Sequence, residues 1–349
     1  TVSEGWGFVQ DDWQVVCDNT RTCRAAGYAS EADTPASILL TALPKVALPK
    51  AQIQFISEVP LDDLKPAELW LNNKNYGVLQ ANKKDSLLYD LSAKQTQALL
   101  DHARIVTKIE IRAGDNYWQI SDKGMSAVLL KLDDVQGRVG TPIALVSKNH
   151  PNRQRPKVAL PKPIIQKAFA YSAKDNKTLA PSKLAYFQKN IDNWVDINVE
   201  QLIGSKDAMG DCELINPKTE TYQRMSEYGS TLLGWDFIPV DDSYTLAAHS
   251  CWLGAYNSSN GYWLIDNAKP SKPTLITTAG NDYFDGEIFA THKDRGIGDC
   301  WNRTAWTWNG KTFAKSEESS TGMCRGFAGG AWDLPTYVSQ VTKNDAKAQ

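Results

Sequence analysis

Six cysteines place the strongest constraint on what this chain can fold into. Cys17 and Cys23 lie on either side of the polar sequence Asp-Asn-Thr-Arg, with β-branched and aromatic residues in the flanking stretches. This pattern predicts a hairpin that brings the two cysteines within reach of a disulfide. A disulfide at this place indicates an oxidising compartment.

The other four cysteines lie in the second half of the chain: Cys212, Cys251, Cys300 and Cys324. Six cysteines allow about 15 pairings, and the sequence alone does not choose among them. We expect each to pair with its nearest neighbour: Cys17–Cys23, Cys212–Cys251 and Cys300–Cys324. Loop entropy would then stabilise the fold by roughly 2, 4 and 3.5 kcal/mol, respectively. Zinc binding is the alternative, but Cys-x-x-Cys and His-x-x-x-His spacings are absent, so we expect no metal and no cofactor.

Composition narrows the class of protein further. A formal charge of −2 over 349 residues gives no reason to expect binding to nucleic acid or an anionic membrane. No apolar run approaches the roughly 18–20 residues that span a bilayer. Tryptophan (12) and tyrosine (13) are abundant and histidine (4) is scarce, which favours sheet packing or ligand stacking over acid–base or metal sites. The start at Thr1, together with the cysteines, leads us to expect a removed signal peptide rather than a trimmed chain.

We predict a mostly β, α+β fold with two lobes. The first, residues 1–147, contains alternating strands at 13–17, 53–59, 67–71 and 105–111. A capping box at Ser92 begins one helix. Ser121 is expected to cap a second helix, which Gly137 and Gly140 end. The apolar face of this second helix comprises Met125, Val128, Leu129, Leu132 and Val135.

A proline-rich linker, residues 148–163, is expected to join the lobes in an extended conformation, with its basic residues solvated. The second lobe, residues 164–349, begins with a helical stretch over 181–204. An antiparallel sheet domain follows from residue 231, with turns at 257–261, 285–286 and 309–310. Residues 281–287 are acidic but lack the ligand spacing of a calcium loop, so a hairpin turn is the better interpretation.

Five separated motifs carry a family resemblance. They are residues 8–28, 251–257, 295–300, 306–313 and 324–326, in this order along the chain. Together they resemble the bacterial family catalogued as domain of unknown function 1176, over nearly the whole chain. The Asp12-Trp13-x-x-x-Cys17 start and the sequence Gly-Met-Ser-Ala at 124–127 are also similar to the invasion-associated locus B domain. The resemblance implies a periplasmic or secreted protein of a Gram-negative bacterium and carries no reaction.

Six tryptophans of the second lobe form the first candidate site: Trp252, Trp263, Trp301, Trp306, Trp308 and Trp332. Trp306 and Trp308 are two residues apart, so on a strand they face the same side. A row of indoles could stack on sugar rings or anchor a partner protein. The more ordinary role is packing in a β-core, and we weigh that role higher.

Charged residues near the last cysteine pair form the second candidate site. They are Arg295, Asp299, Arg303 and Arg325. If Cys300 and Cys324 are bridged, Asp299 and Arg325 would come near each other, and the cluster could bind a carboxylate or phosphate. A structural ion pair between two loops is the simpler role and the one we favour. His249 and His292 could serve as acid–base groups of an envelope hydrolase, but no nucleophile motif accompanies them.

These observations favour a non-enzymatic periplasmic or secreted envelope protein that binds a ligand or maintains the envelope. The partner would be an envelope protein or polysaccharide, and the sequence does not specify an oligomeric state. The first alternative is a glycan-binding module that uses the C-terminal tryptophans, and the second is the hydrolase. No catalytic residue is assigned.

Overall fold

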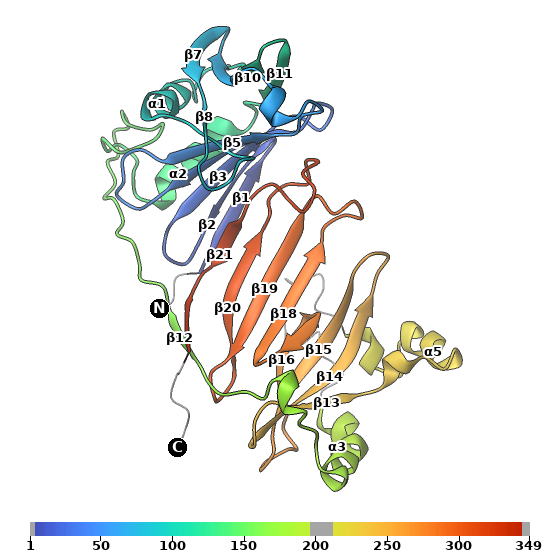
Figure 1. Ribbon diagram of the computed structural model, residues 1–349. Coiled ribbons are helices and arrows are strands. Elements are labelled where there is room, and N and C mark those ends of the chain that lie inside the picture. The colour runs from blue at the N-terminus through green and yellow to red at the C-terminus, as the bar shows by residue number, and fades with distance from the viewer. Residues whose placement is uncertain (1–3, 196–211, 344–349) are drawn as a thin grey trace. The chain divides into compact units, whose positions relative to one another are not determined.

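A computed structural model describes residues 4–195 and 212–343 of the chain. The fold is mostly β, with several antiparallel sheets and a few helices, as predicted (Figure 1). Two compact units make up the chain, which passes between them five times. Unit 1 comprises Thr1–Lys162, Ile297–Trp301 and Ser319–Val338, and unit 2 comprises Pro163–Gly296, Asn302–Glu318 and Ser339–Gln349.

This division differs from the predicted lobes, because two segments expected in the second lobe belong to unit 1. The Cys300–Cys324 disulfide joins these segments to each other. Trp332 and Leu334 of the longer segment are buried among residues of the first hairpins. Apolar burial therefore assigns residues 319–338 to the N-terminal sheet, although more than 150 residues of chain intervene.

The larger sheet of unit 1 is antiparallel, and its strand order is β1-β2-β3-β4-β5-β9-β8. Cys17 and Cys23 lie directly opposite each other on β2 and β3 and form a disulfide, which confirms the predicted hairpin. The bounds of the strands are Trp6–Gln10 (β1), Trp13–Cys17 (β2), Cys23–Tyr28 (β3), Ala36–Ala42 (β4), Lys50–Phe55 (β5), Gln80–Ala81 (β8) and Tyr89–Asp90 (β9).

One face of this sheet, the inner face, is covered by two helices and a smaller sheet of order β11-β10-β6-β7. Helix α2 lies across β1–β3 and buries Met125, Val128, Leu129 and Leu132, the predicted apolar face. The capping box at Ser92 begins α1, as predicted. The bounds are Glu68–Leu71 (β6), Lys74–Val78 (β7), Ala93–Asp101 (α1), Ile109–Ala113 (β10), Asn116–Ile120 (β11) and Met125–Val135 (α2), with a 3-10 turn η1 at Leu61–Asp63.

The opposite, outer face of the sheet is covered by the returning segment 319–338. Val16, Tyr28 and Leu39 pack there against Trp332 and Leu334 of this segment. Three hydrogen bonds fix the contact: Trp332 Nε1 donates to Ser37 Oγ, the Met323 amide to Tyr28 Oη, and Asn19 Nδ2 to the Val338 carbonyl. Both faces of β2–β4 are therefore buried, which explains why all five residues of β2 are buried.

The proline-rich segment has neither helix nor strand, in agreement with its composition. It is nevertheless attached to unit 1 along its length. The amides of Gln154, Lys157 and Leu160 donate to carbonyls of Val139, Gln136 and Thr20, at 2.8–3.1 Å.

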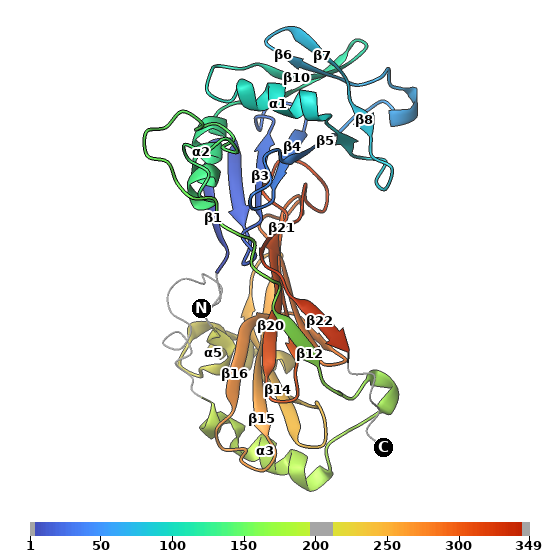
Figure 2. The ribbon, with the colours of Figure 1, turned by 90° about the vertical axis from the view of Figure 1, so that its left-hand side faces the viewer.

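Unit 2 contains two layered sheets, of which the first has the order β13-β14-β15-β16. The second contains β17, β18, β19 and β20 in this order, and β12 and β22 form a parallel pair (Figure 2). The strand bounds are Ile164–Lys167 (β12), Asp236–Pro239 (β13), Tyr244–Leu253 (β14), Ser258–Asp266 (β15), Thr274–Gly280 (β16), Asp282–Phe284 (β17), Glu287–Lys293 (β18), Trp301–Trp308 (β19), Phe313–Ser320 (β20) and Gln340–Lys343 (β22), and β21 of unit 1 is Leu334–Tyr337.

The first sheet of unit 2 is also buried on both faces. Ala247, Trp263 and Ile265 face Phe187 and Ile191 of helix α3. On the opposite face, alternate residues of β14 and β15 pack against Ile288, Trp308 and Phe313. The helices and 3-10 turns of unit 2 are η2 (Ala173–Asp175), α3 (Pro181–Trp194), η3 (Glu213–Ile215), α5 (Glu220–Glu227) and η4 (Thr231–Leu233).

All three expected disulfides are present, and Cys212–Cys251 belongs to unit 2. Cys251 lies where the register between β14 and β15 shifts, between Ser250 and Trp252. An irregularity of this kind turns a side chain out of the regular alternation, here toward Cys212.

Several local predictions need correction. Helix α2 begins after Gly124, in the left-handed conformation, and the Ser121 hydroxyl accepts the Lys123 amide instead of capping the helix. The predicted strands 53–59 and 105–111 overlap β5 and β10 only in part, because residues 56–59 and 105–108 are not in strands. The turn expected at 257–261 lies earlier, at 254–257. Helix α3 ends at Trp194, and the rest of the predicted helical stretch, from 196, lies outside the described residues.

Where the structure describes the chain, it contains no helix with the length and apolarity needed to cross a membrane.

The packing of β3 against Trp13 gives a first testable prediction. A Cβ at Gly27 would lie 2.2 Å from the fully buried Trp13 ring, so Gly27→Ala should lower the free energy of unfolding by about 1–3 kcal/mol. At Gly7 the nearest atom to a new Cβ is 3.6 Å away, and Gly7→Ala is the matched control, expected within about 0.5 kcal/mol of wild type. Urea denaturation measures both, and equal effects would contradict this packing.

Candidate functional site

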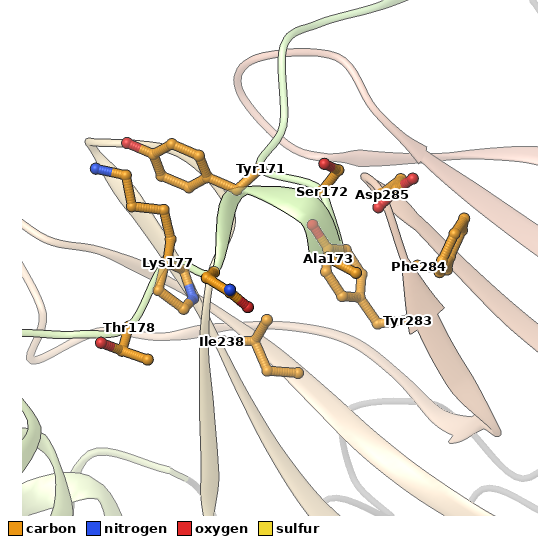
Figure 3. A pocket seen from close by; sticks show the side chains of 11 residues that line it. Tyr171, Ser172, Ala173, Lys177, Thr178, Ile238, Tyr283, Phe284 and Asp285 are labelled. Atoms are coloured by element: carbon orange, nitrogen blue, oxygen red, sulfur yellow. The ribbon is translucent and has the colours of Figure 1, made fainter.

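A pocket of about 330 Å³ opens in unit 2, between η2, the end of β13 and the β17–β18 hairpin (Figure 3). Its aromatic lining is Tyr171, Tyr283 and Phe284. Its other lining residues are Ser172, Ala173, Asn176, Lys177, Thr178, Ile238, Pro239 and Asp285. The volume lies at the lower end of the roughly 300–1,000 Å³ range of small-molecule pockets, which suits a small ligand.

Local turn chemistry builds one wall of the pocket. The Ser172 amide and hydroxyl both donate to the Asp175 carboxylate, at 2.6 and 2.9 Å, and so fix the start of η2. Asn176 ends η2 with φ 47°, in the left-handed region that asparagine tolerates better than most residues. The chain therefore reverses here and presents the side chains of 171–178 around one opening (Figure 3).

The β17–β18 hairpin builds the opposite wall. Asp285 and Gly286 have φ values of 46° and 83°, the positive values that a tight two-residue hairpin turn requires. Gly286 is buried, and a Cβ there would lie 2.9 Å from Ala170 Cβ. Close packing against Ala170 thus holds the turn in place. Phe284, with 57% of its surface exposed, lines the pocket.

Both tyrosines of the pocket are held by hydrogen bonds and remain neutral at physiological pH. Tyr171 Oη donates to Asp242 Oδ1, and this bond is the main cause that raises the pKa of Tyr171 to about 12. Tyr283 Oη accepts the Gly286 amide at 3.1 Å, and burial raises its pKa to about 12. The edge of the Tyr283 ring contacts Phe313, at 6.0 Å between centroids. The two rings are therefore fixed, uncharged surfaces.

The charges of the pocket balance. Lys177 is the one cation among the lining residues and Asp285 the one anion. The Lys177 ammonium lies 5.1 Å from the centre of the Tyr171 ring, a cation–π distance. It also helps to lower the pKa of Asp175, after the larger effect of the Ser172 hydrogen bonds. No histidine or cysteine is among the described residues that line the pocket.

Three of the six tryptophans predicted as a stacking platform are closed to a ligand. Trp263, Trp308 and Trp332 are buried, and Trp308 is fully inaccessible. Trp252, Trp301 and Trp306 are partly buried. Trp306 and Trp308 do face the same core, where Trp308 packs against Tyr244 and Phe313. A ring whose faces are covered cannot stack on a sugar, so Trp263, Trp308 and Trp332 are not available as a stacking platform.

The residues of the predicted charged cluster are assigned to both units. Asp299 and Arg325 belong to unit 1 and Arg295 to unit 2. The buried Asp299 carboxylate accepts the Gly326 amide at 2.8 Å. Arg325 pairs with Asp12, at 2.8 Å between Nη1 and Oδ1. Asp299 and Arg325 thus both tie residues 324–326 into unit 1, each through a different partner.

The two histidines of unit 2 are buried, at 4% exposure each. His249 Nδ1 lies 2.6 Å from the Ser250 carbonyl, and its ring packs on Trp235. Burial lowers the pKa of His292, against the opposing effects of its bond to the Ser258 backbone and of Asp294. Neither ring lines the pocket.

Sequence reasoning did not find this pocket. It identified the 285–286 turn and interpreted 281–287 as a hairpin, which is confirmed. It attached no function to residues 171–178. Their polar side chains are ordinary for a loop, and only their position opposite Tyr283 and Phe284, more than 100 residues later, makes them a site.

Removal of the Arg325 side chain provides a second prediction. Its ion pair with Asp12 is largely enclosed, with side-chain exposures of 12% and 17%, and Nη1 also donates to the Ala29 carbonyl at 3.0 Å. Arg325→Ala should therefore cost about 1.5–3 kcal/mol in urea denaturation. The exposed Arg303–Glu317 pair provides the control, and Arg303→Ala should cost less than about 1 kcal/mol. A larger loss in the control would refute this interpretation.

His292 provides a prediction about pH. Its folded-state pKa lies below the ordinary 6.5, so the unfolded chain takes up a proton that the folded chain resists. The stability it contributes is present above pH 6.5 and is lost as pH falls below that value. Urea denaturation at several pH values should show that the free energy of unfolding decreases below pH 6.5. His292→Gln should reduce this pH dependence, whatever the variant's stability at pH 8. An unchanged slope in the variant would show that His292 is not responsible.

Comparison with curated proteins and with solved structures gave no match. Residues 8–339, nearly the full length of the chain, match a family model. The chain therefore belongs to the family described as protein of unknown function, DUF1176.

Proposed function

We propose that this chain is a non-enzymatic binding protein of the bacterial cell envelope, located in the periplasm or secreted. The pocket of unit 2 is the observation that carries the proposal. It combines fixed aromatic and apolar surfaces with a few polar groups, the composition typical of small-molecule sites. The ligand would be a component of the envelope, such as part of a polysaccharide or of a protein.

The disulfides support the location outside the cytoplasm. All six cysteines are paired, and none is free. Disulfides persist in oxidising compartments and are rare where thiols are kept reduced.

Binding is favoured over hydrolysis because of where the histidines lie. A general base must come within hydrogen-bond reach of the group from which it takes a proton. His249 and His292 are enclosed in unit 2, away from the lining of the pocket. The tryptophan platform is likewise less well supported than the pocket, because Trp263 and Trp308 are core residues.

The proposal is tested by thermal unfolding of the oxidised protein with a broad panel of sugars, amino acids, peptides, fatty acids and nucleotides. A ligand at 100 times its Kd adds about 2.7 kcal/mol to the stability of the folded state and raises Tm. Ala173 is exposed and lines the pocket, so Ala173→Phe should fill it and abolish the shift.

The control is Ala268→Phe, which adds the same ring at an exposed position of unit 2 outside the pocket. It should retain the full shift in Tm. No shift with any compound, or an equal shift in the Ala173→Phe variant, would refute binding at this pocket.

A further inference from the structure

We infer that the pocket of unit 2 binds a neutral pyranose sugar, free or at the end of an oligosaccharide. This inference rests on the proposed binding function and specifies the class of ligand. Three properties of the lining lead to it: its charge balance, its aromatic rings, and its polar side chains that have no hydrogen-bond partner among the residues that the structure describes.

The charge balance argues against an anionic ligand. Sites for phosphate or clustered carboxylates gather arginine forks or several cations. Here Lys177 and Asp285 give the lining no net charge. The Lys177 ammonium already interacts with the Tyr171 ring and with Asp175. A ligand with a net negative charge would meet Asp285 without an uncommitted cation to offset it.

The aromatic rings suit a ligand with apolar C–H faces. The face of an aromatic ring is electron-rich and attracts the weakly positive hydrogens of a C–H group. A pyranose presents such hydrogens on its faces and hydroxyls around its rim. Phe284 is 57% exposed on a tight turn, and Tyr171 is fixed by its bond to Asp242. Figure 3 shows the rings of Tyr171, Tyr283 and Phe284 placed around the opening.

The polar side chains suit a ligand that both donates and accepts hydrogen bonds. Asn176 and Thr178 can do both, and Asp285 accepts. Their side chains make no hydrogen bond to any other residue in the described part of the chain. A purely apolar ligand would remove water from these groups without replacing its hydrogen bonds, which is costly. Sugar hydroxyls would replace them.

Isothermal titration calorimetry of the full oxidised chain tests the inference. The probes are neutral monosaccharides and disaccharides, the matching uronic acids, and a fatty acid. Neutral sugars should bind, and the uronic acids should bind more weakly. Tighter binding of the disaccharide than of the monosaccharide would identify the end of an oligosaccharide as the ligand. Equal binding of the two would identify a free sugar.

Two variants separate the contributions. Phe284→Ala removes the exposed ring and should weaken sugar binding by about 3- to 10-fold. Thr178→Val keeps the shape of the side chain but removes its hydroxyl, and should also weaken sugar binding by about 3- to 10-fold. Tyr228→Ala, at an 81% exposed ring outside the pocket, is the control and should bind as wild type does.

The outcomes distinguish this inference from the proposed function. The protein could instead bind the fatty acid and no sugar, with binding strengthened by Thr178→Val and weakened by Phe284→Ala. This result would overturn the inference that the ligand is a sugar and would keep the proposed binding function. Preference for uronic acids over neutral sugars would overturn the argument from charge. Sugar binding unaffected by either variant would place the sugar elsewhere. No binding of any probe, together with no response to the wider thermal panel, would overturn both proposals.

Discussion

Burial of the central strands on both faces is the constraint on which the fold depends. In unit 1, Val15 and Val16 are neighbours on β2 that enter different cores. Each face must be covered, because exposed apolar strands would lose the hydrophobic free energy of burial. Helix α2 and the smaller sheet cover the inner face, and residues 319–338 cover the outer one. The first sheet of unit 2 meets the same requirement with α3 on one side and the second sheet on the other.

The pocket forms at the margin of these covering layers. β13 and the β17–β18 hairpin both contribute lining residues where they end or turn. Turns are the parts of a fold that carry binding residues, provided that a rigid scaffold positions them. Here the buried Gly286 and the bond from Tyr171 to Asp242 provide that support. Trp263, Trp308 and Trp332 are used in packing, whereas Phe284 is presented at the pocket.

Structural features that depend on a few neighbouring residues could be predicted from the sequence. The Cys17–Cys23 hairpin, the capping box at Ser92 and the 285–286 turn each depend on local geometry. The prediction that Ser121 caps helix α2 was wrong, because Gly124, in the left-handed conformation, takes the N-cap position next to the helix. The cover that Trp332 provides depends on contacts across the whole chain, which periodicity does not encode. The pocket could not be predicted for the same reason, since its two walls are distant in sequence.

Hydrogen exchange of the β2–β4 amides tests most directly whether residues 319–338 complete unit 1. The comparison is between the full chain and residues 1–162 produced alone. Without the returning segment, Tyr28 and Leu39 lose their cover and the hydrogen bonds to Ser37 and Asn19 are lost. These amides should then exchange much faster in the fragment than in the full chain. Equal protection in the two would contradict this account, because it would show that residues 1–162 form a complete domain on their own.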